Sequence, residues 1–377
     1  MRLPRHAELW LPGYLRAAAT QRRESRQRRG TIDILFAITD HYEPLCGNAS
    51  DEVGRRRVAR WAGEYPALAS QFVDADGRHP QHTFFYPIEE YRPDLLEPLA
   101  ALCEQGFGEV EVHLHHDQDT AAHLREELTA FTRRLHDQHG LLSTDASGAL
   151  RYGFIHGNWA LSNSLPDGRW CGVDDELSVL RDTGCYADLT MPAAPSPAQV
   201  RTVNQIYYAV GAARGPRAHD HGARAAVGRP ASAEDLLLVQ GPLMPTFRRA
   251  TWGIIPRVEN GELNAGHPPT TMRFADWLSC GISVEGRPEW VFIKVHTHGA
   301  PEPEAAMMLG PETAAFHRDV LAAYNNGQRF RLHYVTAREM VNIVHAAEDG
   351  KWGNAGAYRD YRYARPRASG EASRVSA

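Results

Sequence analysis

The chain has 377 residues, 43% of them hydrophobic, and a formal net charge of −5. This length suits one barrel-sized domain with extensions or two ordinary domains. The near-neutral charge argues against a general nucleic-acid-binding surface. The five cysteines are odd in number and include no Cys-x-x-Cys pair, which argues against a disulfide framework or a thiolate zinc site and favours a reducing compartment.

The N-terminal region offers no secretory signal. No run of about 18 apolar residues follows anywhere, so we expect a cytoplasmic protein without a transmembrane segment. Residues 1–30 are polar and rich in arginine. They predict a solvated helical or flexible arm, and the alternative is an arm that contacts anionic lipid or glycan.

From residue 31 onward, strand-like runs alternate with helix-like segments. Strands are predicted at 32–38, 82–86, 109–115, 152–156, 186–190, 236–239, 291–295 and 330–334. Helices are predicted at 51–72, 94–105, 120–138, 174–183, 311–324 and 337–347. This alternation indicates parallel βα units, and hence an α/β domain over 31–347. Residues 211–231 lack periodicity and predict an irregular insertion, and the polar tail at 364–377 is expected to be disordered.

Potential metal ligands stand where three of the predicted strands end. Asp40 and His41 end the first strand, residues 113–119 end the third, and His296 and His298 end the seventh. In a (β/α) barrel, the active site is built from residues at the C-terminal ends of several strands. Three such strand ends can therefore converge on one divalent cation.

The segment His-Leu-His-His-Asp-Gln-Asp at 113–119 is the strongest of these signals. Alternation along a strand places His113 and His115 on the same side, and a turn after them lets Asp119 fold back over His115. Imidazole nitrogens and a carboxylate oxygen suit zinc or a similar first-row metal, with a position left open for water. The alternative is a solvated polar loop with scattered histidines.

A possible substrate-binding segment follows the strand at 152–156. His156 and Gly157 precede Asn158, which offers amide donors and acceptors, and Trp159, which offers a flat apolar face. Sugar rings stack on such faces, so the segment fits a glycan cleft, although Trp159 could equally pack in the core. The sequence contains no phosphate-binding loop, no dinucleotide-binding glycine motif and no Gly-x-Ser-x-Gly nucleophile turn.

Over residues 31–300, the order of these motifs resembles the polysaccharide deacetylases. These are NodB-like, metal-dependent esterases that remove N-acetyl groups from glycans, and the chain looks most similar to divergent members associated with bacterial exopolysaccharide synthesis. Asp40 and His41 match the family's Asp-Asp pair, so the resemblance implies Asp40 as the base and His41 as a metal ligand. His115 and Asp119 match the family's two ligands spaced four residues apart.

The later motifs of the resemblance imply the remaining site residues. The segment at 154–159 keeps the family's glycine- and aromatic-containing loop, but Ile155 stands where the family has arginine. The stretch at 180–188 resembles one that ends in an aspartate, here Asp188. Val295 and His296 match the last motif, which makes His296 the catalytic acid, with His298 beside it.

Together the resemblance implies a distorted (β/α) barrel of the deacetylase type with a divalent metal ion, zinc being expected, and a glycan substrate. The expected ligands are His41, His115 and Asp119, with His113 in reserve. The expected substrate-binding residues are His156, Asn158, Trp159 and Asp188. An association with polysaccharide-synthesis machinery is also expected. Two alternatives remain: hydrolysis of a glycosidic bond, which needs two carboxyl groups across the sugar, and an inactive glycan-binding scaffold, which the missing arginine favours.

Overall fold

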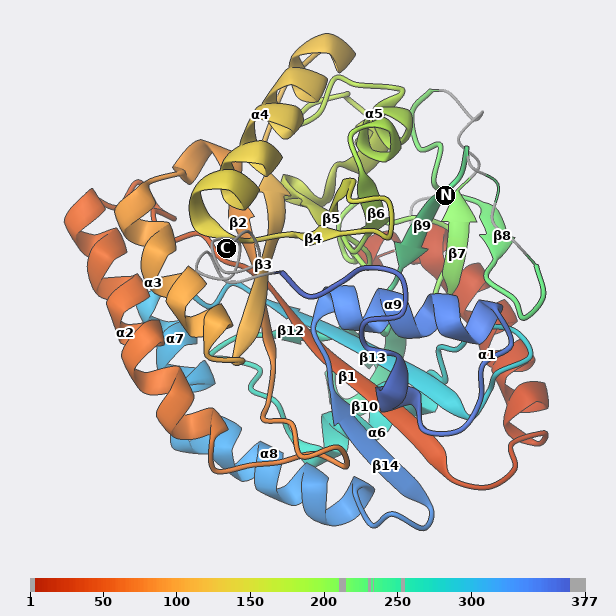
Figure 1. The fold of residues 1–377 in the computed structure, drawn as a ribbon. Coiled ribbons are helices and arrows are strands. Elements are labelled where there is room, and N and C mark those ends of the chain that lie inside the picture. Colours follow the sequence, from red (N-terminus) through yellow and green to blue (C-terminus); the bar gives the residue numbers. More distant parts are fainter. Residues whose placement is uncertain (1–3, 210–214, 230–231, 233, 252–254, 367–377) are drawn as a thin grey trace.

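A mostly parallel sheet of twelve strands forms the centre of the molecule (Figure 1). The computed structural model describes residues 4–209, 215–229, 232, 234–251 and 255–366. The hydrogen-bonded order is β12-β13-β1-β2-β3-β5-β6-β9-β7-β8, with β14 paired to β1 and β4 paired to β5. The strands of this sheet are β1 (Ile32–His41), β2 (His82–Pro87), β3 (Gly108–Leu114), β4 (Ser143–Thr144), β5 (Leu150–His156), β6 (Cys185–Asp188), β7 (Ile206–Ala209), β8 (Gly222–Arg224), β9 (Leu236–Val239), β12 (Glu262–Leu263), β13 (Trp290–Thr297) and β14 (Phe330–Tyr334).

Helices cover the sheet on both faces. In Figure 1, α2, α3, α7 and α8 line one side, α4 and α5 lie along the top, and α9 crosses in front of β1 and β13. The helices are α1 (Ala7–Ser25), α2 (Asp51–Ala69), α3 (Pro93–Glu104), α4 (Ala121–His139), α5 (Glu176–Asp182), α6 (Thr271–Ser279), α7 (Glu302–Met308), α8 (Pro311–Tyr324) and α9 (Ala337–Glu348). Every residue of α9 is buried, so this helix is enclosed by protein on all sides.

Strand β1 is the central element and supports the functional site. It pairs with β13 along one edge, and its other edge is shared by β14 in its first half and β2 in its second half. All of its residues except Ile32 are buried, as expected for a parallel strand covered on both faces. Alternate side chains enter two different cores: Phe36 packs in the core shared with the outer helices, whereas Leu35 packs in the core shared with α9.

The predicted α/β class is confirmed by this arrangement. The hydrogen-bonded path through the described strands ends at β12 and β8 and shows no pairing that closes it into a barrel. The chain after β6 nevertheless approaches β13, because the Lys294 ammonium on β13 donates to the main-chain oxygens of Leu189 and Met191.

The N-terminal region packs more closely than an exposed arm would. Helix α1 buries Trp10 and Ala17, and Glu24 pairs with Arg224 of β8 at 2.5 Å. The expected irregular insertion contains β8, and of the expected disordered tail, residues 367–377 lie outside the described residues. None of the helices in the described part of the chain has the length and apolar character needed to cross a bilayer.

Several elements had no counterpart in the sequence-based prediction. They are helices α6 and α7, the strands β4, β7, β8 and β12, and the two-stranded sheet of β10 (Met244–Thr251) and β11 (Ile255–Glu259). Most of them are short or lie at an edge, where hydrophobic periodicity is weakest.

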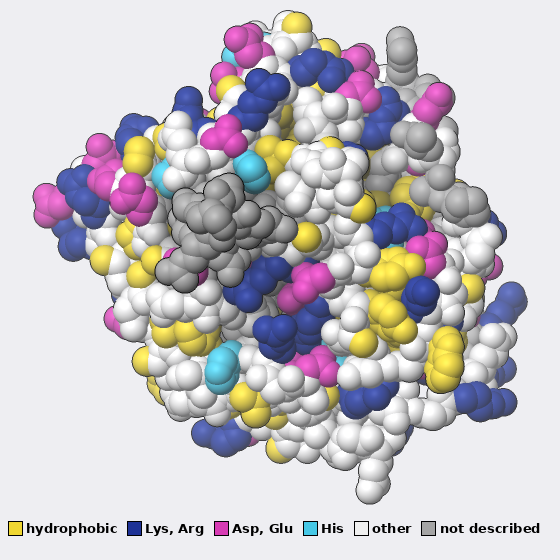
Figure 2. All heavy atoms as spheres, viewed as in Figure 1, with side chains coloured by type: hydrophobic (Ala, Val, Ile, Leu, Met, Phe, Trp, Pro, Cys, Tyr) yellow, Lys and Arg dark blue, Asp and Glu magenta, His cyan; other side chains and the backbone are white. Residues whose placement is uncertain are grey.

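Basic and acidic side chains are interspersed over the face shown in Figure 2. This distribution agrees with the near-neutral net charge of −5.

Candidate functional site

Five side chains gather at the carboxyl ends of β1, β3 and β13. We call them the rim cluster: His41, Glu43, His113, His115 and His298. The Glu43 Oε1 atom lies 3.2 Å from His113 Nε2 and 3.6 Å from His115 Nε2. The ring of His41 lies 4.9 Å from that of His113 and 4.8 Å from that of His298, measured between centroids. Two overlapping groups in this cluster have ligand atoms within 4.8 Å of one another, the distance range of a shared ion.

Hydrogen bonds to the Nδ1 atoms orient the imidazoles of His113 and His115. His113 Nδ1 donates to the main-chain oxygen of Ile155 at 2.8 Å, and His115 Nδ1 donates to the Glu89 carboxylate at 2.5 Å. With Nδ1 protonated, the Nε2 atom of each ring donates to Glu43 when the ring is protonated, and directs a lone pair to the same point when the ring is neutral. Metal-ligating histidines almost always donate their other N–H in this way. The donor set of imidazole nitrogens and one carboxylate therefore fits a first-row divalent metal.

The protonation states of Glu43 and His41 suit metal binding. Burial alone would raise the pKa of Glu43, but the hydrogen bond and charge of His113, together with His298 and His115, lower it to about 2. Burial, followed by the neighbouring rings of His298 and His113, lowers the pKa of His41 well below its usual value. At neutral pH, the carboxylate is therefore ionised and this imidazole is neutral, which are the forms that bind a cation. Burial would lower the pKa of His115, but its hydrogen bond to Glu89 and the charge of Glu43 raise it, so a bound metal ion would displace a proton from this ring.

Trp159 and His296 flank the rim cluster. The Trp159 ring lies 5.7 Å from the ring of His41 and 5.9 Å from that of His298, so it forms an aromatic wall beside them. The ring of His296 lies 6.2 Å from that of His41. Burial and the charge of Lys294 lower the pKa of His296 well below its usual value, so this ring is neutral.

Asp40, the expected base, lies on the opposite face of β1. Its buried carboxylate accepts hydrogen bonds from His82 Nε2 at 2.8 Å and from the Gly299 amide at 2.7 Å. Trp61 of α2 donates to the Gly299 carbonyl at 2.9 Å. Because adjacent side chains in a strand point to opposite faces, His41 reaches the rim cluster while Asp40 holds the loop that carries His298.

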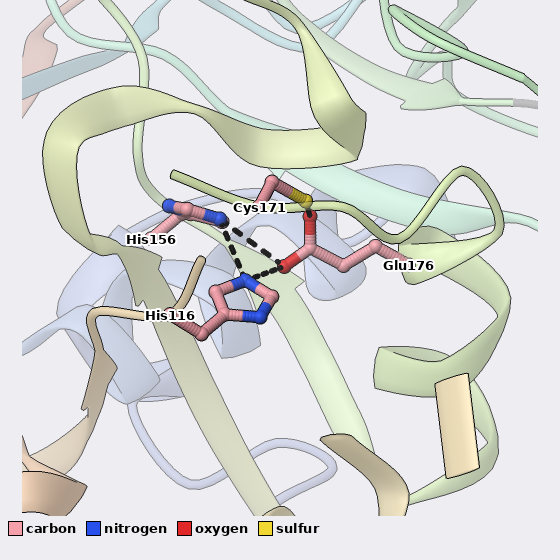
Figure 3. Close-up of side chains that lie close together, drawn as sticks. All are labelled: His116, His156, Cys171 and Glu176. Atoms are coloured by element: carbon pink, nitrogen blue, oxygen red, sulfur yellow. Dashed lines mark hydrogen bonds and ion pairs between the residues drawn. The ribbon is translucent and has the colours of Figure 1, made fainter. Parts of the chain in front are cut away.

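Asp119 lies away from the rim cluster, beyond the turn that follows β3. Its carboxylate accepts hydrogen bonds from His116 Nδ1 at 2.9 Å and from His123 Nδ1 at 2.8 Å. His116 and His156 belong to a second cluster with Cys171 and Glu176 (Figure 3). Of the four expected metal ligands, the structure therefore brings together His41, His113 and His115 but not Asp119.

Gly157 separates the two clusters. A Cβ atom at this position would lie 2.3 Å from Cδ2 of His115 and 2.7 Å from the carbonyl oxygen of Leu114. Any side chain here would displace the His115 ring or the end of β3. The absence of a side chain thus allows the end of β5, which carries His156, to pack directly against His115.

The other expected substrate-binding residues occupy different surroundings. Asn158 is half-buried and has a left-handed backbone with φ of 55°. Asp188 is buried, accepts hydrogen bonds from the main chain and hydroxyl of Thr190 at 3.1 and 2.6 Å, and has its pKa raised by burial. Asp188 therefore lies beneath the surface, close to Lys294.

A surface pocket of about 550 Å³ opens beside His115, and Glu89, Leu114 and Asp119 also line it. The sequence-based prediction did not include the carboxylates that bind these histidines, Glu43 and Glu89. Period-2 spacing could have identified Glu43, which lies two residues beyond His41. The prediction also did not include His116, Cys171 and Glu176 as site residues. No nearby sequence motif marks Cys171 or Glu176 as a possible ligand.

The sequence matches no protein-family model and no curated protein. Membership of the deacetylase family therefore stays a prediction that rests on motif order.

Proposed function

We propose that the chain is a metal-dependent hydrolase that acts on a carbohydrate, and that its reaction is the removal of N-acetyl groups from a hexosamine-containing glycan. One observation carries this proposal. The Glu43 carboxylate is 3.2 and 3.6 Å from the Nε2 atoms of His113 and His115, and the Nδ1 atoms of both rings are hydrogen-bonded elsewhere. Two imidazoles and one carboxylate are the ligand set of many hydrolytic zinc sites.

Glu43, His113 and His115 would hold the metal ion, with His41 beside them. When bound, such an ion polarises a carbonyl oxygen and lowers the pKa of a coordinated water. Closed zinc sites have four protein ligands, whereas catalytic sites leave a position open. The neighbouring pocket of about 550 Å³ at His115 would provide access to that position.

The remaining residues would bind substrate and move protons. His298 is partly exposed and lies beside His41, so its imidazole can take a proton from water and return it to the departing amine. Asp40 would position His298 through its hydrogen bond to Gly299. The aromatic wall formed by Trp159 fits a sugar ring. In this proposal, buried and neutral His296 packs behind His41 and supports it.

The fold-level part of the proposal is a distorted barrel of the deacetylase type. It is supported by the Lys294 hydrogen bonds that link β13 to the chain after β6. It is also supported by the placement of the rim cluster at the carboxyl ends of the parallel strands, where barrel enzymes have their active sites. Zinc is the metal we propose for the rim cluster, and an association with polysaccharide-synthesis proteins stays a prediction.

The test is acetate release from N-acetylated oligosaccharides, measured with and without chelator. We expect metal-dependent release by the wild type and a loss of at least about 100-fold in Glu43→Gln, which keeps the shape of the side chain but removes its charge. Glu302→Gln, at a mostly exposed carboxylate, is the matched control and should retain wild-type activity. Release of reducing sugar in place of acetate would support glycoside hydrolysis instead. Wild-type protein that contains bound metal but releases neither product would contradict the proposal.

A further inference from the structure

A second buried cluster lies where β3 and β5 end, beside the start of α5. It consists of His116 after β3, His156 at the end of β5, Cys171 in the following loop, and Glu176, the first residue of α5. Figure 3 shows the four side chains pointing toward one another. The Nε2 atoms of His116 and His156 are 2.9 Å apart, and they lie 3.3 and 3.5 Å from Glu176 Oε1.

Hydrogen bonds fix the tautomers of both histidines. His116 Nδ1 donates to Asp119 at 2.9 Å, and His156 Nδ1 donates to the carbonyl oxygen of Gly157, which can only accept. In the neutral rings, both Nε2 atoms therefore direct lone pairs at each other and at Glu176. Glu176 Oε1 is buried and has no hydrogen-bond partner among the described residues. Three acceptors thus face one another without enough donors.

A bound cation resolves this arrangement better than a proton does. One proton on His116 Nε2 has to be shared between His156 Nε2 at 2.9 Å and Glu176 Oε1 at 3.3 Å, so neither acceptor gains a full hydrogen bond in this buried site. A divalent ion satisfies all three. Metal–nitrogen distances of about 2.0–2.1 Å in a tetrahedral site place neighbouring ligand atoms about 3.3–3.4 Å apart. The separations of 3.3 and 3.5 Å agree with this value, and 2.9 Å is slightly shorter.

The thiol of Cys171 is in place to be the fourth ligand. Its Sγ atom is 3.4 Å from Glu176 Oε2, and all four residues offer ligand atoms within 4.8 Å of one another. The main-chain N–H groups of Asn163 and Val173 point at this sulfur from 3.3 and 3.5 Å. Such donors stabilise negative charge on sulfur, and hence a thiolate ligand.

We propose that His116, His156, Cys171 and Glu176 bind a second divalent first-row metal ion, zinc by ligand type, in a closed four-ligand site separate from the rim cluster. Binding replaces the thiol proton of Cys171, which passes to solvent. The site is closed because its side chains are at most 6% exposed. Closed four-ligand zinc sites stabilise the fold, whereas catalytic sites keep an open position.

This second ion would anchor the segment between β5 and α5. Residues 157–175 contain only the short 3-10 turns η3 (Gly157–Trp159) and η4 (Leu161–Asn163). Five non-glycine residues here have left-handed backbone angles with φ between 49° and 63°: Asn158, Trp159, Ser162, Asn163 and Trp170. Such conformations are unfavourable for residues with a side chain and persist where the surroundings enforce them. The same segment carries Trp159, which contacts the rim cluster, so the ion would also fix the aromatic wall.

The test exchanges cobalt into the purified full-length protein and records its absorption spectrum. A thiolate ligand gives an intense near-ultraviolet charge-transfer band that imidazole and carboxylate ligands do not give. We expect this band in the wild type, in Glu43→Gln and in Cys280→Ala, which removes another buried thiol. We expect its loss in Cys171→Ala. A wild-type cobalt spectrum without the band would overturn the proposal and requires no variant to fold.

Metal stoichiometry separates this proposal from the proposed function. Zinc bound per chain should fall by one equivalent in Glu176→Gln and by one different equivalent in Glu43→Gln. If the wild type and Glu43→Gln both give the thiolate band but the wild type has no hydrolytic activity, the second site stands and the proposed function fails. If Cys171→Ala and Glu176→Gln bind as much zinc as Cys280→Ala, and hold it equally against a competing chelator, the second site is refuted.

Discussion

Two histidine–carboxylate clusters in this molecule look alike by distance but differ in how their polar atoms are satisfied. Asp74, Asp76 and His333 also have ligand atoms within 4.8 Å of one another, like the cluster around His116. In the His333 cluster, however, both ring nitrogens donate to carboxylates, Nδ1 to Asp76 and Nε2 to Asp33, each at 2.7 Å. In the His116 cluster, only the Nδ1 atoms donate to ordinary acceptors, and the two Nε2 atoms face each other and Glu176.

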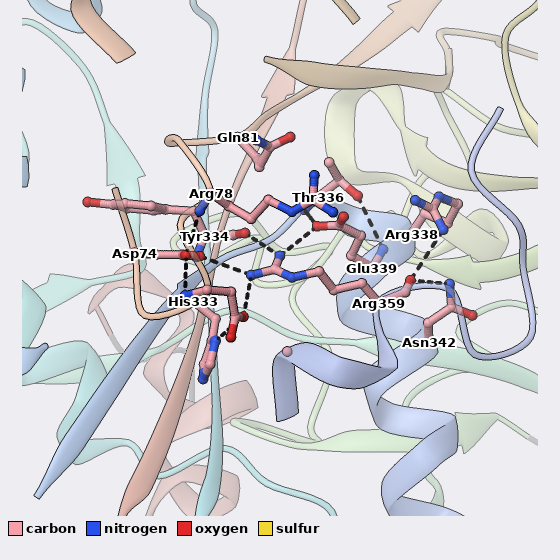
Figure 4. A network of polar contacts seen from close by, with 12 residues as sticks. Asp74, Arg78, Gln81, His333, Tyr334, Thr336, Arg338, Glu339, Asn342 and Arg359 are labelled. Atoms are coloured by element: carbon pink, nitrogen blue, oxygen red, sulfur yellow. Dashed lines mark hydrogen bonds and ion pairs between the residues drawn. The ribbon is translucent and has the colours of Figure 1, made fainter. Parts of the chain in front are cut away.

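Arginine supplies the remaining positive charge around His333. Figure 4 shows Arg359 between Asp74, Glu339 and the strand that carries His333. Its guanidinium donates to Asp74, Asp76 and Glu339 at 2.9, 3.1 and 2.9 Å. Every carboxylate there already has a cationic partner. A metal site is therefore indicated where buried acceptors lack donors. Close approach of residues that can ligate a metal does not indicate such a site by itself.

The largest expected effect is the loss of stability when Arg359, beside the His333 cluster, is replaced. Replacing Arg359 by Leu leaves buried Asp74 and Glu339 without their partner, which should lower the free energy of unfolding by about 3–5 kcal/mol. Urea unfolding checks this, and the loss should be equal with and without chelator. Arg55→Leu, which breaks an exposed pair with Asp94, should cost less than about 1 kcal/mol. A chelator-dependent loss in the Arg359 variant would break the distinction between the clusters.

The next effect concerns the cluster around His116. At free zinc 100-fold above its dissociation constant, a single ion bound only to the folded state contributes about 2.7 kcal/mol. We expect Glu176→Gln to be less stable than the wild type by an amount of this size. We also expect its free energy of unfolding no longer to depend on the zinc concentration. Urea unfolding at several free zinc concentrations measures it. A variant whose stability rises with zinc as steeply as that of the wild type would show that Glu176 is not a ligand.

A smaller effect is expected from the second-sphere residue Asp119. Its carboxylate orients His116, and losing such a partner typically reduces metal affinity about 10–100-fold. Competition of Asp119→Asn with a chromophoric chelator for zinc measures this change. Asp137→Asn, at an exposed carboxylate, is the control. Equal affinities in the two variants would contradict the assigned orientation.

The smallest effect concerns how the free energy of unfolding of the metal-free protein depends on pH. We expect His156 and His333 to contribute to this dependence with opposite signs. Burial lowers the pKa of His156 to about 4. The unfolded state then binds more protons between this value and about 6.5, so stability falls as the pH falls through that range. Burial would also lower the pKa of His333, but its hydrogen bonds to Asp33 and Asp76 raise it. The stabilisation that His333 contributes is therefore complete below about pH 6.5. It is lost as the pH rises through the raised pKa of His333 in the folded state.

Difference curves isolate these two contributions. Unfolding free energies of the wild type minus those of His156→Gln should decrease toward acid, and the corresponding difference for His333→Gln should decrease toward alkali. Two curves with the same sign would contradict the assigned protonation states.

The sequence predicted the regular part of the fold because that part has strong local patterns. The buried run at 32–38 and the helical spacing at 51–72 correspond to β1 and α2. Alternation along β3 correctly placed His113 and His115 on one side of the strand. The expectation that the carboxyl ends of parallel strands lie together correctly placed His41 near them.

The remaining parts of the site depend on turns and on distant contacts. Asp119 leaves the rim cluster because the chain turns at Gln118, which has a left-handed φ of 49°. Asp40 points to the opposite face because the strand continues through it to His41. Cys171 and Glu176 reach His116 only through the fold of the segment between β5 and α5, and no short-range pattern records such a contact.

Gly157 contacts an imidazole of each cluster, because it packs against the ring of His115 and its carbonyl oxygen accepts a hydrogen bond from His156. A larger residue there would displace the His115 ring, and the resulting shift of the main chain would move the oxygen that orients His156. Among descendants of this chain, we expect this glycine to be lost only where both histidine clusters are also lost.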